Sequence, residues 1–396
     1  MKFFFLILLY LLTFEFLLSQ EQRLTLAQVL DSAQLKHPAF RVAQLKVEAV
    51  ASIQKTYLDF YPTHFNYAQG KIFGNRTDSR FEINQFLGSP FLMASQKKML
   101  SSSLKTVQNE QQLSVFLALA NVKKAYYACL YSLELSKLYV EEYQVFNAGV
   151  NFYILNDSSV EGSIDKLMLE TSLLEAEKFA NTAYNDLIQA QNNLAQAAFL
   201  DIETMPADTV FEIYEIAPVS SSETRTPASL YNNIYKSKTE SARNQWSLSK
   251  AAFLPRFCVN YTNQSIMGQS GFQYWSLGIS LPLFPFVESS KKQKSLLDLK
   301  IAELEWEVQR SQFDATTANL LTEMNKLFET INFYYDFGLK QSSTLLHAAK
   351  EQMERGSIDV PKFIWAVQKS YSLRRQYLQT IHEYNQKAIE LEVYAY

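Results

Sequence analysis

Two identical tetrapeptides are the strongest candidates for a functional site in this sequence. Residues 162–165 read GSID, and residues 356–359 read GSID again. Glycine can end a helix in the left-handed conformation, and a serine hydroxyl or an aspartate carboxylate can cap the helix that follows. The same residues could also form an exposed contact surface for another protein. The two interpretations are compatible, and they concern the same residues: Gly162, Ser163, Ile164, Asp165, Gly356, Ser357, Ile358 and Asp359.

Acidic side chains cluster beside both tetrapeptides. Asp157 and Glu161 precede the first, and Glu351 and Glu354 precede the second, with Arg355 next to Glu354. If several chains met around an axis, these carboxylates would form acidic rings that could select or bind cations. Arg355 could then take part in ion pairs that close such an entrance. The alternative is that all five are solvated charges at exposed helix ends.

The remaining reactive residue types form no catalytic pattern. The four histidines have no metal-ligand spacing, and neither cysteine stands in a Cys/His cluster. There is no nucleophile–base constellation, glycine-rich phosphate loop or zinc-protease motif. We therefore expect no enzyme activity, no cofactor and no metal site. The sequence alone does not decide whether Cys129 and Cys258 form a disulfide. The histidines are His37, His64, His347 and His382, of which His64 is expected to face a lumen or an interface.

The tetrapeptides belong to a longer internal duplication. A Phe-x-Pro sequence at residues 60–62 recurs at residues 253–255, and a Lys-Lys pair at residues 97–98 recurs at residues 291–292. The offsets are 193 and 194 residues, and GSID recurs at 194. Three landmarks in one order at nearly one offset indicate that the chain contains two copies of one structural plan. The lysine pairs could meet lipid headgroups or be plain solvated helix starts.

The sequence pattern of each copy predicts the same order of helices and strands. A helix leads to a proline, two short segments alternate with a period of two residues, and a long helical hairpin follows. Glycine and proline are scarce, at ten each, and apolar residues repeat at a 4-3 spacing typical of a coiled-coil seam, as in Leu297, Ile301, Leu304 and Val308. The predicted ranges are a first repeat at 21–200 with its β-hairpin at about 62–89 and helical tip at about 156–165, a connector at 201–227, and a second repeat at 228–396 with its β-hairpin at about 255–284 and tip at about 354–360.

The first 20 residues resemble an export signal. One lysine, a long apolar run and small or polar residues near Ser19 predict a signal peptide over residues 1–20, with an uncleaved anchor as the alternative. No cysteine follows that run, so a lipid-modified N-terminus is not expected. No other stretch approaches the ~20 apolar residues of a transmembrane helix. The formal net charge of −3 gives no support for a nucleic-acid partner.

The alternating segments predict how the exported chain meets a membrane. Apolar side chains occupy one side of each segment, and small or polar side chains occupy the other, as in an outer-membrane β-barrel. Four strands cannot close such a barrel, so two chains with eight strands or three with twelve would have to share one. The residues expected to face lipid are Phe65, Tyr67, Phe81, Ile83, Phe257, Val259, Tyr261, Trp275, Leu277, Ile279 and Leu281.

These features together resemble the TolC-type outer membrane factors, the exit ducts of tripartite efflux pumps and of some secretion systems. LTLAQVLDSAQLKHPAF at residues 24–40 is similar to the opening signature of that family, with His37 in place of its usual Asn and Val29 in place of its usual Ala. FLPRF and ISLPLF resemble its strand signatures, and GSID resembles its periplasmic-tip motif. The match covers essentially the whole chain after residue 20.

The resemblance implies a fold and a set of partners. The expected fold is mainly α with a β-barrel part: long antiparallel coiled-coil hairpins and four transmembrane strands per chain, assembled into a homotrimeric α/β barrel duct. The implied location is the Gram-negative outer membrane, with a helical tunnel in the periplasm. The implied partners are an adaptor protein, which would contact the GSID tips, and an inner-membrane pump. The alternative function is a periplasmic coiled-coil adaptor or scaffold.

Overall fold

The structure is a computed structural model of the chain, and the described residues are 22–58, 61–71, 74–156, 163–200, 204–208, 211–215, 227–281 and 286–395. Several predicted features lie outside those ranges. They are the signal peptide at residues 1–20, most of the connector at residues 201–227, and the tip residues Asp157, Glu161 and Gly162.

The chain divides into two compact units, and each is built from segments that are distant in sequence. A helical unit comprises Met1–Phe40, Val115–Pro227 and Ala315–Tyr396, and a strand-bearing unit comprises Arg41–Ser114 and Ala228–Asp314. Each unit therefore takes residues from both halves of the chain. Two long helices, α4 (Pro90–Asn156) and α7 (Phe286–Phe333), contribute to both units. The mainly helical fold predicted from the sequence is confirmed.

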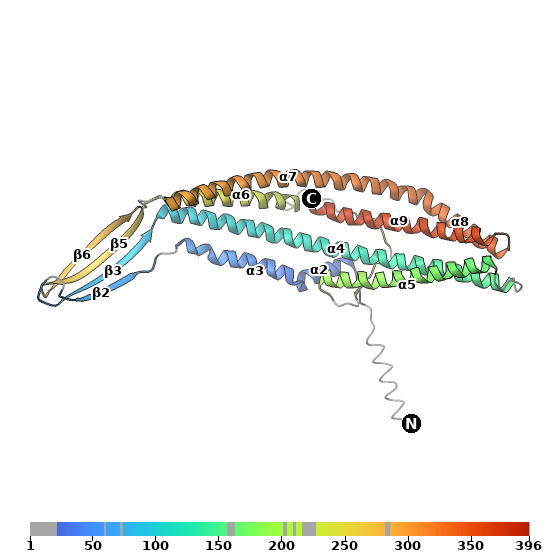
Figure 1. Cartoon of the computed structure of the whole chain (residues 1–396), viewed down its shortest axis with the longest axis horizontal. Coiled ribbons are helices and arrows are strands. Elements are labelled where there is room, and N and C mark those ends of the chain that lie inside the picture. Colours follow the sequence, from blue (N-terminus) through green and yellow to red (C-terminus); the bar gives the residue numbers. More distant parts are fainter. Residues whose placement is uncertain are drawn as a thin grey trace, which may run out of the picture. The chain divides into compact units, whose positions relative to one another are not determined.

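The helical unit packs its helices lengthwise (Figure 1). Besides its parts of α4 and α7, it contains a two-stranded parallel sheet whose register joins Gln22 to Thr204 and Leu24 to Pro206. Its other elements are β1 (Gln22–Leu24), α2 (Leu26–Lys36), α5 (Ile164–Ala198), β4 (Thr204–Pro206), the π-helix η2 (Tyr334–Gly338), α8 (Leu339–Glu354) and α9 (Val360–Ala395).

The start of α2 has a full capping box. The Thr25 hydroxyl accepts a hydrogen bond from the Gln28 backbone N–H, and the Gln28 side chain accepts one from the Thr25 backbone N–H. The two bonds satisfy donors that a helix start would otherwise leave free. Thr25 and Gln28 stand at the spacing of the capping-box signature, and the structure shows that box at the start of α2.

Two apolar cores hold the helical unit together. One surrounds Tyr126 and Leu194, which are fully buried, and joins α2, α4, α5 and α9. Cys129 lies in this core as a free thiol, whose pKa is raised to about 12 by burial. The other core lies beside the helical tips and joins α4, α5, α8 and α9 around Phe146 and Phe363.

A half-buried histidine beside the first core gives stability a pH dependence. His382 stacks on Tyr131 with ring centroids 4.4 Å apart, and its Nδ1 has no hydrogen-bond partner among the described residues. Burial lowers the pKa of His382 below its ordinary 6.5, against a smaller opposing effect of Glu383. The unfolded chain therefore binds a proton near pH 6.5 that the folded chain resists, so stability is lost as the pH falls.

We expect His382→Phe to flatten this acid-side loss, because phenylalanine keeps a ring against Tyr131 and has no site to protonate. The measurement is the free energy of unfolding by denaturant at about pH 7.5 and about pH 5.5 for both proteins. The loss on acidification should be smaller in the variant. An equal loss in both proteins would show that other groups carry the effect.

The strand-bearing unit joins four antiparallel strands to helix ends (Figure 1). The strand order is β2-β3-β5-β6, so the two hairpins share one sheet through β3 and β5. Besides its parts of α4 and α7, the elements are α3 (Pro38–Ser52), the 3-10 helix η1 (Ile53–Leu58), β2 (His64–Gly70), β3 (Asp78–Gly88), α6 (Pro227–Ala251), β5 (Arg256–Ile266) and β6 (Gln269–Ser280).

A hydrogen bond joins the start of β3 to the turn between β5 and β6. The buried Asp78 carboxylate at the start of β3 accepts a 2.9 Å hydrogen bond from the backbone N–H of Gly268, in the turn between β5 and β6. Gly268 has a φ of +80°, and an added Cβ there would lie 3.2 Å from Arg76 Cδ. Glycine fits this turn because it tolerates both the left-handed backbone and the close side chain.

The structure departs from the sequence-based expectation in the second long hairpin. The 4-3 pattern predicts an uninterrupted helix through Tyr334, whereas a π-helical turn spans Tyr334–Gly338 between α7 and α8. A Cβ at Gly338 would lie 2.8 Å from Tyr334 Cδ1, so the tyrosine ring occupies the space that a side chain would need. An inserted turn of this kind is not visible in apolar spacing.

Candidate functional site

The second GSID segment forms a helix end of the Schellman type. Gly356 has a φ of +65°, its N–H donates to Met353 O at 2.9 Å, and the Ser357 N–H donates to Gln352 O at 2.9 Å. The next helix begins at once, because the Asp359 carbonyl accepts from the Phe363 N–H at 3.0 Å. These bonds satisfy helix-end groups that would otherwise lack partners. The segment is therefore a tight corner between α8 and α9.

The first GSID segment begins α5. The Ser163 hydroxyl accepts a 3.2 Å hydrogen bond from the Lys166 backbone N–H, and it lies 3.2 Å from the Tyr153 hydroxyl of α4. Asp165 stands in the first turn, where a carboxylate complements the positive helix end. Ile164 is 74% exposed, so an apolar side chain is presented to solvent at this corner.

The charged residues near the second tip pair within one chain. Arg355 forms an ion pair with Glu351 one turn earlier, and Asp359 pairs with Lys362 at 2.7 Å. Both pairs are largely exposed, and such pairs contribute at most about 1 kcal/mol. An acidic ring or gate at this position stays a prediction, since Asp157 and Glu161 lie outside the described residues.

Below the corners, α4 approaches α9 unusually closely. Gly149 of α4 is buried, and a Cβ added there would lie 2.9 Å from Phe363 Cε1 and 3.2 Å from Phe363 Cζ. The Phe363 side chain is 2% exposed and meets Phe146 edge-on, with ring centroids 6.4 Å apart. The two hairpins therefore share one core, and the glycine is what allows their approach.

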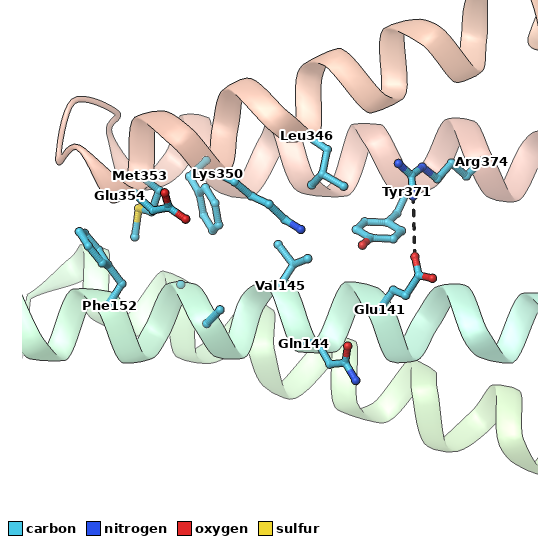
Figure 2. Close-up of a pocket in the computed structure, with 13 residues that line it drawn as sticks. Glu141, Gln144, Val145, Phe152, Leu346, Lys350, Met353, Glu354, Tyr371 and Arg374 are labelled. Carbon is cyan, nitrogen blue, oxygen red and sulfur yellow. Dashed lines mark ion pairs between the residues drawn. The ribbon is translucent and has the colours of Figure 1, made fainter.

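A cavity of about 630 Å³ opens between the same helices. Figure 2 shows Val145 and Phe152 on α4 opposite Leu346, Lys350 and Met353 on α8. Its apolar middle lies between charged ends. At one end Glu141 faces Arg374, 3.7 Å away, and Glu354 lies at the other.

Adjacent ion pairs join α4 to α9 beside this cavity. Arg374 pairs with Glu141, and Arg375 pairs with Glu142, whose side chain is 6% exposed. Burial raises the pKa of Glu142, and the Arg375 guanidinium opposes that shift. Arg374 also donates a 2.9 Å hydrogen bond to the buried Ser342 hydroxyl of α8. These contacts fasten the two hairpins to each other within one chain.

The residues expected to face lipid share one face of the sheet. The register places Phe65 opposite Ile83, Ile83 opposite Tyr261, and Tyr261 opposite Trp275, and directly opposed residues project to the same side. Tyr67, Phe81, Phe257, Val259, Leu277 and Ile279 fall on that side by the same pairing, and Leu281 follows β6. Trp275 is 74% exposed and Leu277 is 85% exposed, so this chain alone leaves the face open.

The opposite face is largely polar. It carries His64, Asn84, Asn260 and Ser276 in one row across the four strands, and Glu82 with Thr262 in a neighbouring row. Phe86, Phe272 and Tyr274 are its aromatic exceptions. Cys258 also lies on this face as a free thiol, in a different unit from Cys129. A sheet with one apolar and one polar face can separate hydrocarbon from water.

Several basic residues cover aromatic rings where the helices meet the strands. Lys97 of α4 lies 5.3 Å above the Tyr57 ring, and Lys292 of α7 lies 5.8 Å above the Phe253 ring. One lysine of each Lys-Lys pair thus occupies a similar setting in each half of the chain. Whether they contact lipid stays a prediction.

One polar cluster of the helical unit was not found from the sequence. The Tyr126 hydroxyl donates to Asp208 Oδ2 at 2.7 Å, and Lys123 Nζ lies 2.7 Å from Glu392 Oε2 and 2.9 Å from the Tyr214 hydroxyl. Burial raises the pKa of Tyr126 well above its ordinary range, and the hydrogen bond to Asp208 adds to the shift. The partners lie far apart in sequence, so no spacing reveals them.

Two further kinds of feature are absent from the described residues. No described helix is long and apolar enough to cross a membrane. No group of three or more His, Cys, Asp or Glu residues in the described part of the chain could hold a metal ion.

Several solved outer-membrane channels share the fold of this chain. The CmeC outer membrane channel of Campylobacter jejuni has a TM-score of 0.78 and 14% identity, over 93% of this chain and 85% of that one. The open-state MtrE outer membrane channel of Neisseria gonorrhoeae gives 0.74 and 18%, over 93% and 88%. VceC, an outer membrane protein of Vibrio cholerae, gives 0.75 and 14%, over 93% and 94%. The sequence matches no protein-family model and no curated protein.

Proposed function

We propose that this protein is an outer-membrane channel of the TolC type, the exit duct of an efflux or type I secretion system. The observation that carries the proposal is the sheet, whose apolar face is exposed while its other face is polar. A fold shared with solved outer-membrane channels supports it. The duct conducts substrates passively, so no residue is assigned a catalytic role.

The slant of the apolar band supports a tilted barrel. On β2 the band centres on Asn66, which pairs through Glu82 with Thr262, whereas on β6 it centres on Gly278, which pairs with Cys258. The band therefore shifts by four residues along β5 (262 to 258) over three strand spacings. At about 3.3 Å per residue and about 4.8 Å per spacing, strands that carry a level band would be tilted by about 43° from the barrel axis. Strands of membrane barrels are tilted by about 35–45°.

An open sheet of four strands requires other copies of the chain. Its unpaired edges are not tolerated in lipid, so the edges of β2 and β6 must meet strands of neighbouring chains. The 4-3 stripe on α7 is also uncovered, since Leu297, Ile301, Leu304 and Val308 are all exposed in the single chain. Three copies would give twelve strands and a lumen, and the stripe would pack against the next copy. We therefore infer a homotrimer.

The GSID corners are the proposed contacts for a periplasmic adaptor. Six corners around one rim of a trimer would present Ile164 and Ile358 with the polar residues beside them. The second corner is compatible with docking because its backbone hydrogen bonds are made within the chain, and the first offers the exposed Ile164 side chain. An inner-membrane pump would complete the assembly.

Cell fractionation tests the proposed location and separates it from the alternative. We expect the protein in the outer membrane as a detergent-stable trimer. A monomer freely soluble in a periplasmic extract would instead support the coiled-coil adaptor or scaffold.

Crosslinking tests the proposed partner. A photoreactive side chain at Ser163 or Ser357 is expected to capture one adaptor protein, identified by mass spectrometry. The same probe at Glu329, an exposed residue of α7 outside the corners, is the matched control. Equal capture from the control position would contradict a contact at the corners.

A further inference from the structure

A second cavity lies in the strand-bearing unit, where α4, α6 and α7 meet the sheet. It has a volume of about 650 Å³. Leu92 of α4, Leu248 of α6 and Ala252, which directly follows α6, give it an apolar side. Three basic residues also line it: Arg256 at the start of β5, and Lys291 and Lys294 in the first turns of α7.

Two of the cations are available for a ligand. Lys294 is paired with Asp298 at 3.1 Å. Among the described residues, the side chains of Arg256 and Lys291 have neither an ion-pair nor a hydrogen-bond partner. Glu288, the remaining carboxylate of the lining, is likewise without an ion-pair partner there and can accept a hydrogen bond. Two free cations from separate elements, with an acceptor beside them, form a site for an anion that also carries hydroxyl groups.

The surroundings of the cavity are those of a membrane interface. Arg256 pairs with Ser280, the last residue of β6, which lies between Ile279 and Leu281 at the end of the apolar band on that strand. Phe286 and Val287 at the start of α7 are 77% and 60% exposed. Lys250 lies 3.6 Å above the Trp246 ring on α6. Aromatic rings and basic residues bordering an apolar band are characteristic of the headgroup level of a bilayer.

We propose that this cavity binds the headgroup of an anionic phospholipid of the phosphatidylglycerol type. Arg256 and Lys291 hold the phosphate oxygens, and Glu288 accepts hydrogen bonds from headgroup hydroxyls. The acyl chains lie over Phe286, Val287 and the apolar end of β6. The inference rests on the proposed outer-membrane function, and it adds a lipid-binding site on the helix side of the barrel.

The test is native mass spectrometry of the assembled protein purified in detergent, titrated with phosphatidylglycerol. Separate titrations with inorganic phosphate and with diacylglycerol test the phosphate and the acyl chains alone. We expect phosphatidylglycerol to be retained and the other two to be lost. The Arg256→Gln/Lys291→Gln double variant should retain it roughly tenfold or more weakly, because each basic residue near an anionic headgroup contributes substantially.

Two further variants serve as controls for the position and for the charge of the basic residues. Lys300→Gln removes an exposed cation of α7 that lies outside the cavity, and it should bind as the unaltered protein does. Arg256→Lys/Lys291→Arg preserves both charges and should restore binding. Equal retention by the double glutamine variant, or phosphate alone binding as tightly as the lipid, would overturn the inference. A channel that conducts but retains no phosphatidylglycerol defeats this inference alone, whereas a chain that never enters membranes defeats the proposed function.

Discussion

Leu277→Arg is expected to destabilise the membrane-inserted protein by about 2–4 kcal/mol, the cost of a cation on the lipid face near the middle of a barrel wall. Leu277 is 85% exposed and lies near the centre of the apolar band on β6, between Trp275 and Ile279. In lipid the guanidinium would lose its hydration with no partner beside it. The measurement is the free energy of unfolding by denaturant from lipid vesicles, together with the yield of trimer.

Ser276→Arg is the matched control. Ser276 is the preceding residue of β6, and it projects to the polar face of the sheet. An arginine there would point into a water-filled lumen, so stability should change by less than about 1 kcal/mol. Equal losses in the two variants would contradict the assignment of faces. A larger loss for Ser276→Arg would reverse it.

Gly149→Leu is expected to separate the helical tips and to lower stability by about 1–3 kcal/mol, the usual range for overpacking a filled core. Even a Cβ at this position would lie 2.9 Å from Phe363 Cε1, and the ring has little room to move because it is buried. Leucine forms helices well, so the loss would come from packing alone. Thermal or denaturant unfolding gives the magnitude.

Two comparisons isolate the contact. Asn147→Leu places the same side chain on an exposed position of α4 two residues away, and it should be nearly neutral. Gly149→Ala combined with Phe363→Leu should lose less than the sum of the single changes, since the smaller side chain vacates the space that the methyl group needs. Strict additivity would show that Gly149 and Phe363 do not meet.

The sequence predicted the regular elements well, because their signals are local and periodic. The Thr-x-x-Gln spacing at Thr25 is that of a capping box, which the structure shows, and the alternation in β5 and β6 matches the pairing of Tyr261 with Trp275. The mainly helical class followed from scarce glycine and proline. Periodicity records which side of an element is apolar, and the element type follows from its period.

Features that depend on partners distant in sequence were not predictable. The short strand β4 has three residues including Pro206, too few to alternate, and it exists because β1 pairs with it. The π-turn at Gly338 depends on where the Tyr334 ring lies. The close approach at Gly149 requires Phe363, which is more than 200 residues away in sequence. Apolar spacing also predicted the stripe from Leu297 to Val308 without indicating that one chain leaves it exposed.

The most direct test of the central proposal is single-channel recording from the purified protein in planar lipid bilayers. A trimer that encloses a water-filled lumen with the polar face of its sheet predicts discrete conductance steps of uniform size. Leu277→Arg should reduce the number of inserted channels, because the substitution acts on the lipid face. A purified, folded protein that never raises the conductance of the bilayer would contradict the channel.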